Sequence, residues 1–322
     1  MIAIWLLVTI AITCVSLISL SPRGGEGQGE GRPFLLLRPV DAPTPAEQEN
    51  LKQPNAGKIL TGPVTHHNRK LGHLQNALST LAPKTLLIVD ADVRVDDALI
   101  NGLLSALDAG AELAWAAPRP EAKGLTRGLL VQSLHSFQSL DAITRGPRPV
   151  CGKAIALGPQ AIEILRELPD CLGEDLELAG RLHAKNLKVT LAGEANLPGP
   201  DASLRTLLAR FTRWMQVLKA HRPFLFPSIP LLFAATPLLS LAALWDRSAP
   251  ILIGTLVLIS LRATLAAVLE RRAGIFMGWF GAEVLLLCCW VNALLLGSKV
   301  TWRGRVLEVG LHGRLSGSGS AE

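Results

Sequence analysis

The segment Leu86-Leu87-Ile88-Val89-Asp90-Ala91-Asp92 places an uninterrupted apolar run directly before two carboxylates. A short apolar run of this kind is typical of a strand buried on both faces of a parallel sheet. Ligands bind at the carboxyl ends of such strands. If the strand continues, Asp90 and Asp92 point to one side, where they could hold Mg²⁺ or Mn²⁺ against a diphosphate. A pair of this kind can also do no more than cap the next turn.

The residues on either side alternate between strand patterns and helix patterns. Strands are predicted over residues 33–39, 58–60, 85–89, 113–117 and 188–192. Helices are predicted over residues 46–52, 70–81, 98–109, 125–140 and 176–185. This alternation predicts an α/β fold with a doubly wound, mostly parallel sheet, and it places Asp90 and Asp92 at the edge where such sheets bind ligands.

The ends of the chain are far more apolar than its middle. The 322 residues are 49% hydrophobic, and the mean hydropathy is +0.34. Residues 2–20 form an uncharged run, close to the ~20 residues needed to cross a bilayer. Further apolar runs cover residues 224–245, 249–269 and 275–297. We predict an N-terminal transmembrane anchor and C-terminal transmembrane helices, with a cleaved signal peptide as the alternative for the first run.

These patterns divide the chain into five parts. The predicted parts are an anchor (1–21), a flexible Gly-rich linker (22–32), a cytosolic catalytic domain (33–222), membrane helices (223–298) and a basic tail (299–322). The five cysteines contain no metal-type C-x-x-C pair and favour a reduced compartment. Prolines at 227, 230 and 237 mark the first C-terminal run as a candidate re-entrant or interfacial segment. Within the apolar runs, Arg262 and Glu283 could face a lipid-acceptor groove, pair with each other or snorkel to the membrane surface.

A second acidic pair, Glu174-Asp175, opens a helical pattern further along the chain. Acidic residues in a first turn interact favourably with the helix dipole, so plain capping is one interpretation. The other makes Asp175 a general base that deprotonates an acceptor hydroxyl. Such a base needs a fixed position within hydrogen-bond reach of that hydroxyl.

A cationic and aromatic cluster, Arg210-Phe211-Thr212-Arg213-Trp214, precedes the apolar C-terminal third. Its two guanidinium groups are three residues apart and share one helix face. They could bind phosphate oxygens, with the indole stacking on or lining a pocket. In a chain of net charge +6, the cluster could equally be a positive-inside signal. The aromatic interleaving that stacks bases is missing from the sequence, so nucleic acid is not an expected partner.

Taken in order, these strings resemble motifs of the ceramide glucosyltransferase family, glycosyltransferase family 21, which includes bacterial hopanoid-associated members. The likeness extends over most of the chain. The matching segments are Arg38-Pro39-Val40-Asp41 (K-P-L-x-G-x-D in the family), Asn68-Arg69-Lys70 (N-P-K), Asp90 to Val95 (D-S-D-x-R-V), Cys151-Gly152-Lys153 (T-G-x-S), Gly173-Glu174-Asp175 (A-E-D), Arg210-x-x-Arg213-Trp214 ((Q/R)-x-x-R-W) and Val300 to Arg305 (W-R-G-R).

The resemblance implies an inverting, membrane-bound glycosyltransferase of GT-A type. It would move a hexose or N-acetylhexosamine from a UDP-sugar to a hydroxyl of a membrane lipid, either ceramide-like or hopanoid. Asp92, with Asp90, would bind Mg²⁺ or Mn²⁺ and the diphosphate, and Asp175 would be the base. Lys70 would contact the donor. The leaving UDP would be steadied by Arg210, Arg213 and Trp214.

One departure from the family motivates rival interpretations. The family holds the uracil partly with an acidic residue after its second strand, whereas this chain has no aspartate between Asp41 and Asp90. The chain could therefore be a non-catalytic membrane protein with a degenerate transferase domain. A separate alternative is a related transferase that acts on a polyprenyl phosphate or extends a polysaccharide, which the addition of several sugars per acceptor would favour. The Ala-, Leu-, Gly- and Arg-rich composition favours a bacterial inner membrane, with the catalytic domain in the cytoplasm.

Overall fold

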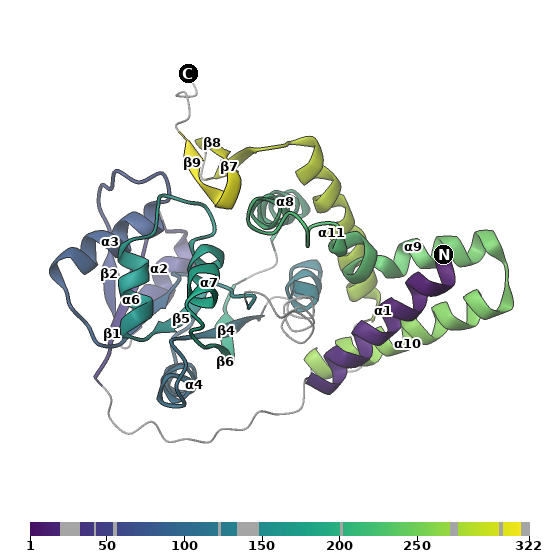
Figure 1. Ribbon diagram of the computed structural model, residues 1–322, viewed down its shortest axis with the longest axis horizontal. Helices are drawn as coiled ribbons and strands as arrows, with labels where there is room; N and C mark the ends of the chain where they lie inside the picture. The colour runs from purple at the N-terminus through teal and green to yellow at the C-terminus, as the bar shows by residue number, and fades with distance from the viewer. Residues whose placement is uncertain are drawn as a thin grey trace. The chain divides into compact units, whose positions relative to one another are not determined.

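The computed structural model describes residues 1–19, 33–41, 43–53, 57–121, 124–133, 148–199, 202–270, 276–302 and 305–316. These residues belong to two compact units. The sheet unit comprises residues 24–121, 144–199 and 298–322, and the helical unit comprises residues 1–23, 122–143 and 200–297. Figure 1 labels the elements of both. The domain boundaries expected from the sequence stay a prediction.

The sheet unit is built on a six-stranded sheet with the strand order β2-β1-β3-β5-β4-β6. Its strands are β1 (Leu35–Pro39), β2 (Lys58–Leu60), β3 (Leu86–Val89), β4 (Leu113–Pro120), β5 (Ala154–Leu157) and β6 (Val189–Leu197). The pairs β1–β2, β1–β3 and β4–β6 are parallel. The expected α/β fold with a mostly parallel sheet is confirmed.

Strand β5 is the element that the sequence analysis missed, and it runs antiparallel to both of its neighbours, β3 and β4. Its four residues are too few to show a period of their own, and a helix follows them directly. In the ladder with β3, Val89 is paired with Ala154. One step further, the Asp90 N–H donates to the Lys153 carbonyl at 2.9 Å. The start of β5 therefore lies beside the end of β3.

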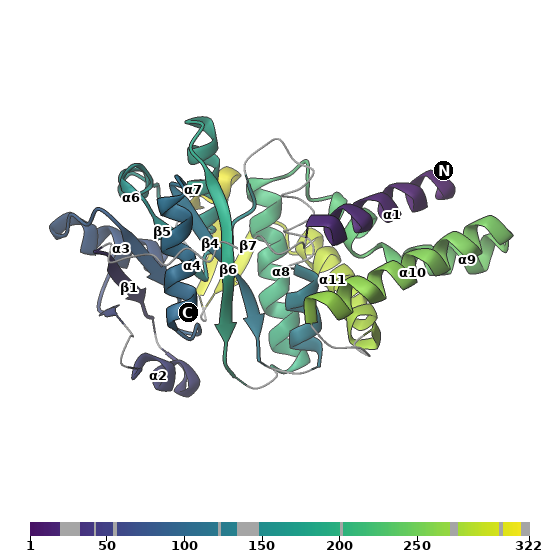
Figure 2. The same ribbon diagram turned by 90° about the horizontal axis from the view of Figure 1, so that it is seen from below.

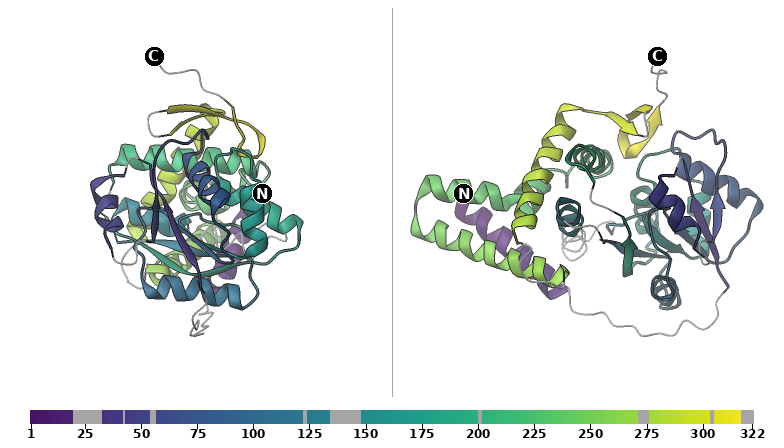
Figure 3. Two further views of the ribbon diagram at one scale, coloured as in Figure 1. Left: turned by 90° about the vertical axis from the view of Figure 1, so that its left-hand side faces the viewer. Right: turned by 180° about the vertical axis from the view of Figure 1, so that it is seen from behind.

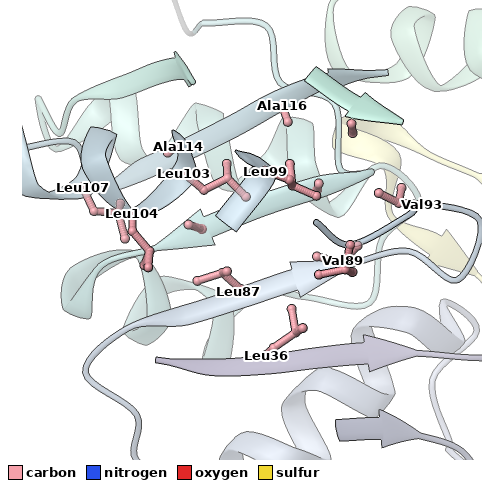
Figure 4. Packing of buried hydrophobic residues seen from close by; sticks show 14 of the residues in the cluster. Leu36, Leu87, Val89, Val93, Leu99, Leu103, Leu104, Leu107, Ala114 and Ala116 are labelled. Atoms are coloured by element: carbon pink, nitrogen blue, oxygen red, sulfur yellow. The ribbon is translucent and has the colours of Figure 1, made fainter. Parts of the chain in front are cut away.

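Helix α4 (Asp97–Asp108) packs against the sheet, and its sequence shows how the helix is capped and buried. Asp96 caps it, with its Oδ1 accepting the Leu99 N–H at 2.8 Å. Its leucines point from one helix face towards the apolar side chains of the sheet (Figure 4). Gly102 allows α4 to pack tightly on β6, because a Cβ there would lie 2.6 Å from the Ala192 carbonyl oxygen (Figure 2).

The other helices of the sheet unit are α2 (Pro45–Leu51), α3 (Arg69–Thr80), α6 (Pro159–Arg166) and α7 (Glu174–Ala184). Helices α2, α3 and α7 agree with the predicted ranges to within two residues, whereas α6 was not predicted. Of the predicted helix 125–140, residues 134–140 lie outside the described residues. The described part, up to residue 133, is helical.

The C-terminal residues form a second, three-stranded antiparallel sheet, where the sequence analysis expected only a basic tail (Figure 3). Its strands are β7 (Lys299–Trp302), β8 (Arg305–Val309) and β9 (Leu315–Ser316). This end of the chain pairs with the loop before α7. The Leu172 N–H donates to the Gly313 carbonyl at 2.8 Å, and the Leu315 N–H donates to the Asp170 carbonyl at 3.1 Å.

The helical unit contains α1 (Ile2–Ser19), α8 (Leu204–His221), a π-helical turn (Ile229–Phe233), α9 (Ala235–Asp246), α10 (Ala249–Glu270) and α11 (Phe276–Leu295). Helices α1 and α10 lie side by side (Figure 3). Glycine at 254 allows this contact, since a Cβ there would meet the Leu6 side chain at 2.4 Å. One described segment, Ala249–Val268, is long and apolar enough to cross a membrane; Ile2–Leu17 and Trp279–Leu295 are shorter apolar helices. The predicted set of transmembrane segments therefore stays a prediction.

A buried ion pair joins the helices of this unit. Arg262 of α10 contacts Glu283 of α11, and their side chains are 1% and 0% exposed. The Glu283 carboxylate also accepts the Thr236 N–H at 2.9 Å and the Trp279 Nε1–H at 2.8 Å. Arg262 donates in addition to the Leu232 carbonyl in the π-helical turn. Of the roles that the sequence leaves open for Arg262 and Glu283, the structure shows the pairing.

Candidate active site

The turn that carries Asp90 and Asp92 is held from below by a buried arginine. Arg38 of β1 is fully buried, and its Nη2 donates to the backbone carbonyls of Asp90 (2.9 Å), Ala91 (3.1 Å) and Val93 (2.7 Å). Because the carbonyls that end β3 lack strand partners at this point, the guanidinium supplies the donors that burial requires. In the sequence, Arg38 is the one charged residue of an otherwise apolar predicted strand, which marks it as unusual without indicating the groups that it binds.

Lys70, which was predicted to contact the donor, lies among the carboxylates of the cluster. Its Nζ is 2.9 Å from Asp90 Oδ1 and 3.1 Å from Glu174 Oε1, and it donates to the Gly152 carbonyl at 2.7 Å. A lysine in the first turn of α3 is opposed by the helix dipole, so the acidic neighbours offset that cost. Burial would lower the pKa of Lys70, but Asp90 and Glu174 raise it above its usual value. The amine is therefore a permanent cation.

A second lysine, Lys153, completes the cluster and was not among the predicted site residues. Its Nζ lies 2.6 Å from Asp92 Oδ2 and 3.2 Å from Asp90 Oδ2. Burial lowers the pKa of Lys153, but Asp92 and Asp90 outweigh it and raise that pKa above the usual value. Burial also raises the pKa of Asp90, and here Lys70 and Lys153 together reverse the direction and lower it. Both lysines and Asp90 are charged at neutral pH.

Asp175 is placed by the first turn of α7. Gly173 adopts a left-handed conformation (φ 82°), which favours glycine and turns the chain into the helix. Asp175 Oδ2 accepts the Gly152 N–H at 2.7 Å, and Oδ1 accepts the Leu176 N–H at 2.9 Å. Burial and the neighbouring Glu174 raise the pKa of Asp175 to about 6, against the opposing effect of Lys70. Two backbone N–H groups thus fix the carboxyl in position, and its pKa lies closer to neutral pH than that of an ordinary aspartate, as a general base requires.

Hydrogen bonds connect the N-termini of the two helices that carry Lys70 and Asp175. The Asp170 carboxylate accepts the N–H groups of His67 (2.6 Å) and Asn68 (2.9 Å). The Asn68 side chain, which caps α3, donates to the Cys171 carbonyl at 2.8 Å and to Glu174 Oε2 at 2.9 Å. The loop 170–172 therefore sets the relative position of the α3 and α7 N-termini.

The sequence matches a known protein family over most of its length. The model of a family described as glycosyl transferase family 21 matches residues 54–315, most of the chain. The chain belongs to glycosyltransferase family 21. Membership of this family makes the chain a glycosyltransferase. No curated protein matches the sequence.

Two solved structures show what this family 21 chain is similar to. One is the mannosyltransferase PcManGT from Pyrobaculum calidifontis in complex with GDP-Man and Mn²⁺ (TM-score 0.55, 15% identity, covering 91% of this chain and 99% of that chain). The other is glucosyl-3-phosphoglycerate synthase from Mycobacterium tuberculosis with Mn²⁺, UDP-glucose and glycerol 3-phosphate (TM-score 0.37, 12% identity, covering 62% of this chain and 86% of that chain). The first likeness shows the GT-A fold.

The residues of the family 21 site fit a divalent cation. Asp92 Oδ1 is buried and has no hydrogen-bond partner among the described residues, which is the condition of an oxygen awaiting a ligand. The part of the chain that the structure describes contains no group of three or more His, Cys, Asp or Glu arranged to hold a metal. Mg²⁺ commonly uses one or two carboxylates together with substrate phosphates, so Asp90 and Asp92 suffice as the protein's contribution.

The predicted residues Arg210, Arg213 and Trp214 all lie on α8, in the helical unit. Helix α8 packs against α11, and the Trp214 ring lies 4.8 Å from that of Phe211, centroid to centroid. The three side chains are half-buried. They share one helix, as the sequence predicted, and their role towards the donor stays a prediction.

Gly152 is where a minimal substitution should disturb the base. A Cβ at this position would lie 3.0 Å from Asp175 Oδ2, so Gly152→Ala must move the carboxylate by a few tenths of an ångström. We expect kcat for sugar transfer to fall by about tenfold, because such displacements weaken proton transfer. The measurement is kcat and KM with varied donor.

The matched control is Gly281→Ala in α11, where the added Cβ meets, among the described residues, only the Leu125 side chain at 3.4 Å, an ordinary contact. This variant should keep the parent kcat. If Gly152→Ala also keeps it, with an unchanged KM, the contact between Gly152 and Asp175 does not matter for turnover.

Proposed function

We propose that this glycosyltransferase moves a hexose or N-acetylhexosamine from a UDP-sugar to a hydroxyl of a membrane lipid, with inversion at the anomeric carbon. The observation that carries the proposal is the convergence on Gly152. Its N–H binds the Asp175 carboxylate, and its carbonyl binds Lys70, which in turn contacts Asp90. The candidate base Asp175 and the candidate diphosphate-binding residues Lys70 and Asp90 are therefore linked through a single residue, Gly152.

The chemistry follows from the charges of these groups. In the proposed reaction, Asp175 accepts the proton of the acceptor hydroxyl while that oxygen forms a bond to the anomeric carbon. The bond from that carbon to the diphosphate oxygen breaks, and the electron pair leaves with UDP. Lys70 stabilises the negative charge that develops on the departing diphosphate. When bound at Asp90 and Asp92, Mg²⁺ or Mn²⁺ would neutralise part of the same charge.

A single displacement explains why one carboxylate base is enough. Attack on the face opposite the leaving group inverts the anomeric configuration and needs no covalent enzyme intermediate. A retaining double displacement would need a nucleophile that reaches the anomeric carbon. The expected product therefore has the opposite anomeric configuration to the donor sugar.

The lipid acceptor and the membrane location are supported by the helical unit. Helices α9 and α10 expose large apolar side chains, which water would not favour and a bilayer would cover. The exposed residues include Leu241, Leu244, Trp245, Leu252, Ile253 and Leu256. Ala249–Val268 can span the apolar core by length and composition. We infer an integral protein of a bacterial inner membrane, with its catalytic domain in the cytoplasm.

The remaining predicted residues fit this reaction in chemical type. Arg210 and Arg213 suit the phosphate oxygens of the leaving UDP, and the Trp214 indole suits the entrance for a lipid acceptor. Binding the lipid at the membrane boundary would allow its hydroxyl to be positioned without transfer of the acyl or hopane body into water. Ceramide-like and hopanoid acceptors both meet this description.

The test is sugar transfer by the detergent-purified full chain. Radiolabelled UDP-glucose or UDP-N-acetylglucosamine is offered with ceramide, hopanoid, polyprenyl phosphate or total lipid, in Mg²⁺ or Mn²⁺. We expect a labelled lipid with the parent and with Glu163→Gln, a control at an exposed carboxylate. Labelled polyprenyl phosphate alone would favour the rival acceptor. No product from any pair, together with no UDP binding, would overturn the assignment.

A further inference from the structure

The carboxylate cluster contains a second lysine, Lys153. Lys70 already forms a salt bridge with Asp90, so Lys153 is not needed to give Asp90 a counter-ion. Yet the Lys153 ammonium lies between the two carboxylates of the turn, 2.6 Å from Asp92 and 3.2 Å from Asp90. Two of the four carboxylate oxygens that could bind a divalent cation are therefore paired with this ammonium.

The backbone fixes the lysine in this place. The residue immediately precedes β5, and its carbonyl accepts the Asp90 N–H, so the two residues are held opposite each other at the end of the ladder. All three side chains keep between 21% and 31% of their surface exposed, although Asp92 Oδ1 itself is buried. A cation held by the fold at this distance interacts strongly with both carboxylates.

We propose that Lys153 is a built-in cation of the Asp90–Asp92 turn. Its ammonium competes with divalent cations for the carboxylate oxygens and, when metal is scarce, binds the donor diphosphate in their place. The first half concerns the metal alone, whereas the diphosphate half rests on the proposed function. Lys70 is a counter-ion of Asp90, but without Lys153 the Asp92 carboxylate would still repel a diphosphate, and the second ammonium weakens that repulsion.

The two lysines are thereby given different tasks. Lys70 is shared between Asp90, Glu174 and the Gly152 carbonyl, so it also holds α3 against the start of α7. Among the described residues, the ion-pair partners of Lys153 are the two aspartates of the turn. It can therefore exchange those partners for phosphate oxygens without loosening a helix.

The test compares the full chain in detergent with its Lys153→Met variant, in two titrations that need no turnover. Mn²⁺ is titrated without nucleotide and followed by electron paramagnetic resonance of the free ion. UDP is titrated calorimetrically in EDTA. We expect Lys153→Met to bind Mn²⁺ at least about tenfold more tightly, because the competing charge is gone. We expect its metal-free UDP affinity to fall at least about tenfold.

Two controls separate this role from a structural one. Lys153→Arg keeps the charge and should bind Mn²⁺ like the parent, whereas Lys52→Met removes an exposed lysine of α2's C-terminus and should change neither titration. Thermal unfolding checks that each variant folds. Unchanged or weaker Mn²⁺ binding by a folded Lys153→Met would overturn the proposal. Tighter Mn²⁺ binding in a protein that transfers no sugar would support the built-in cation while the proposed function fails.

Discussion

Asp175→Asn is expected to lower the rate of sugar transfer by at least about a hundredfold, the usual contribution of a positioned general base. The amide cannot accept a proton from the acceptor hydroxyl. It can still accept the Gly152 N–H that holds the present carboxylate at 2.7 Å. Donor binding at Asp90 and Lys70 should therefore be nearly unchanged, and the loss should appear in kcat.

The parent enzyme should show the matching pH dependence. Because the pKa of Asp175 is raised to about 6, the base is ionised above that pH and becomes protonated below it. We expect kcat/KM to fall about tenfold per pH unit below pH 6 and to be flat from about pH 6.5 to 8. A profile that stays flat down to pH 5 would show that Asp175 is not the base.

Stability provides the control for this variant. A carboxyl with a raised native pKa favours folding when it is protonated, so its contribution weakens as pH rises from about 4 to 6 and stays lost above that range. The amide of the Asp175→Asn variant carries no charge to be buried, which offsets its poorer interaction with the Leu176 N–H. We expect this variant to melt no lower than the parent at pH 7.5, so a lost activity there cannot come from unfolding.

Glu283→Ala should have the largest effect on stability, about 3 to 5 kcal/mol, because it leaves the buried Arg262 without its counter-charge. The carboxylate also serves the Thr236 N–H and the Trp279 indole, so two further donors lose their acceptor. The measurement is unfolding of the full chain in detergent, followed by circular dichroism. Thr264→Ala, at an exposed position of helix α10, which carries Arg262, should cost little.

A double variant distinguishes the charge from the packing. Arg262→Met combined with Glu283→Met removes both charges and keeps apolar volume, an exchange that is often nearly neutral. We expect it to recover part of the loss, with the remainder due to the unpaired Thr236 N–H. If Glu283→Ala melts like Thr264→Ala, the pair does not hold α9, α10 and α11 together.

The parts of the site that the sequence could predict are those signalled by local pattern. The apolar run before Asp90 marks a buried strand end, and the acidic first turn marks the start of the Asp175 helix. Both positions follow from chain neighbours alone, and the structure connects both to Gly152, Asp175 directly and Asp90 through Lys70. The resemblance to the family then added Lys70, whose neighbours in the sequence say nothing of a phosphate.

Lys153 and Arg38 could not be predicted in the same way, because their roles depend on pairing across the sheet. Lys153 meets Asp90 only because β5 runs antiparallel to β3, and a four-residue strand gives no sign of its direction. Arg38 acts on backbone carbonyls, whose need for donors no side-chain pattern reveals. The second, C-terminal sheet was missed for the same reason.

The pairing of residues 313–315 with residues 170–172 has a consequence for the order in which the protein is made. Ribosomes synthesise chains from the N-terminus, so the loop behind Asp175 leaves the ribosome long before its backbone partners do. Every described helix from α8 to α11 is made in between. The loop 170–172 therefore acquires these backbone partners only after helices α8 to α11 have been synthesised, and a chain arrested before residue 313 would lack them.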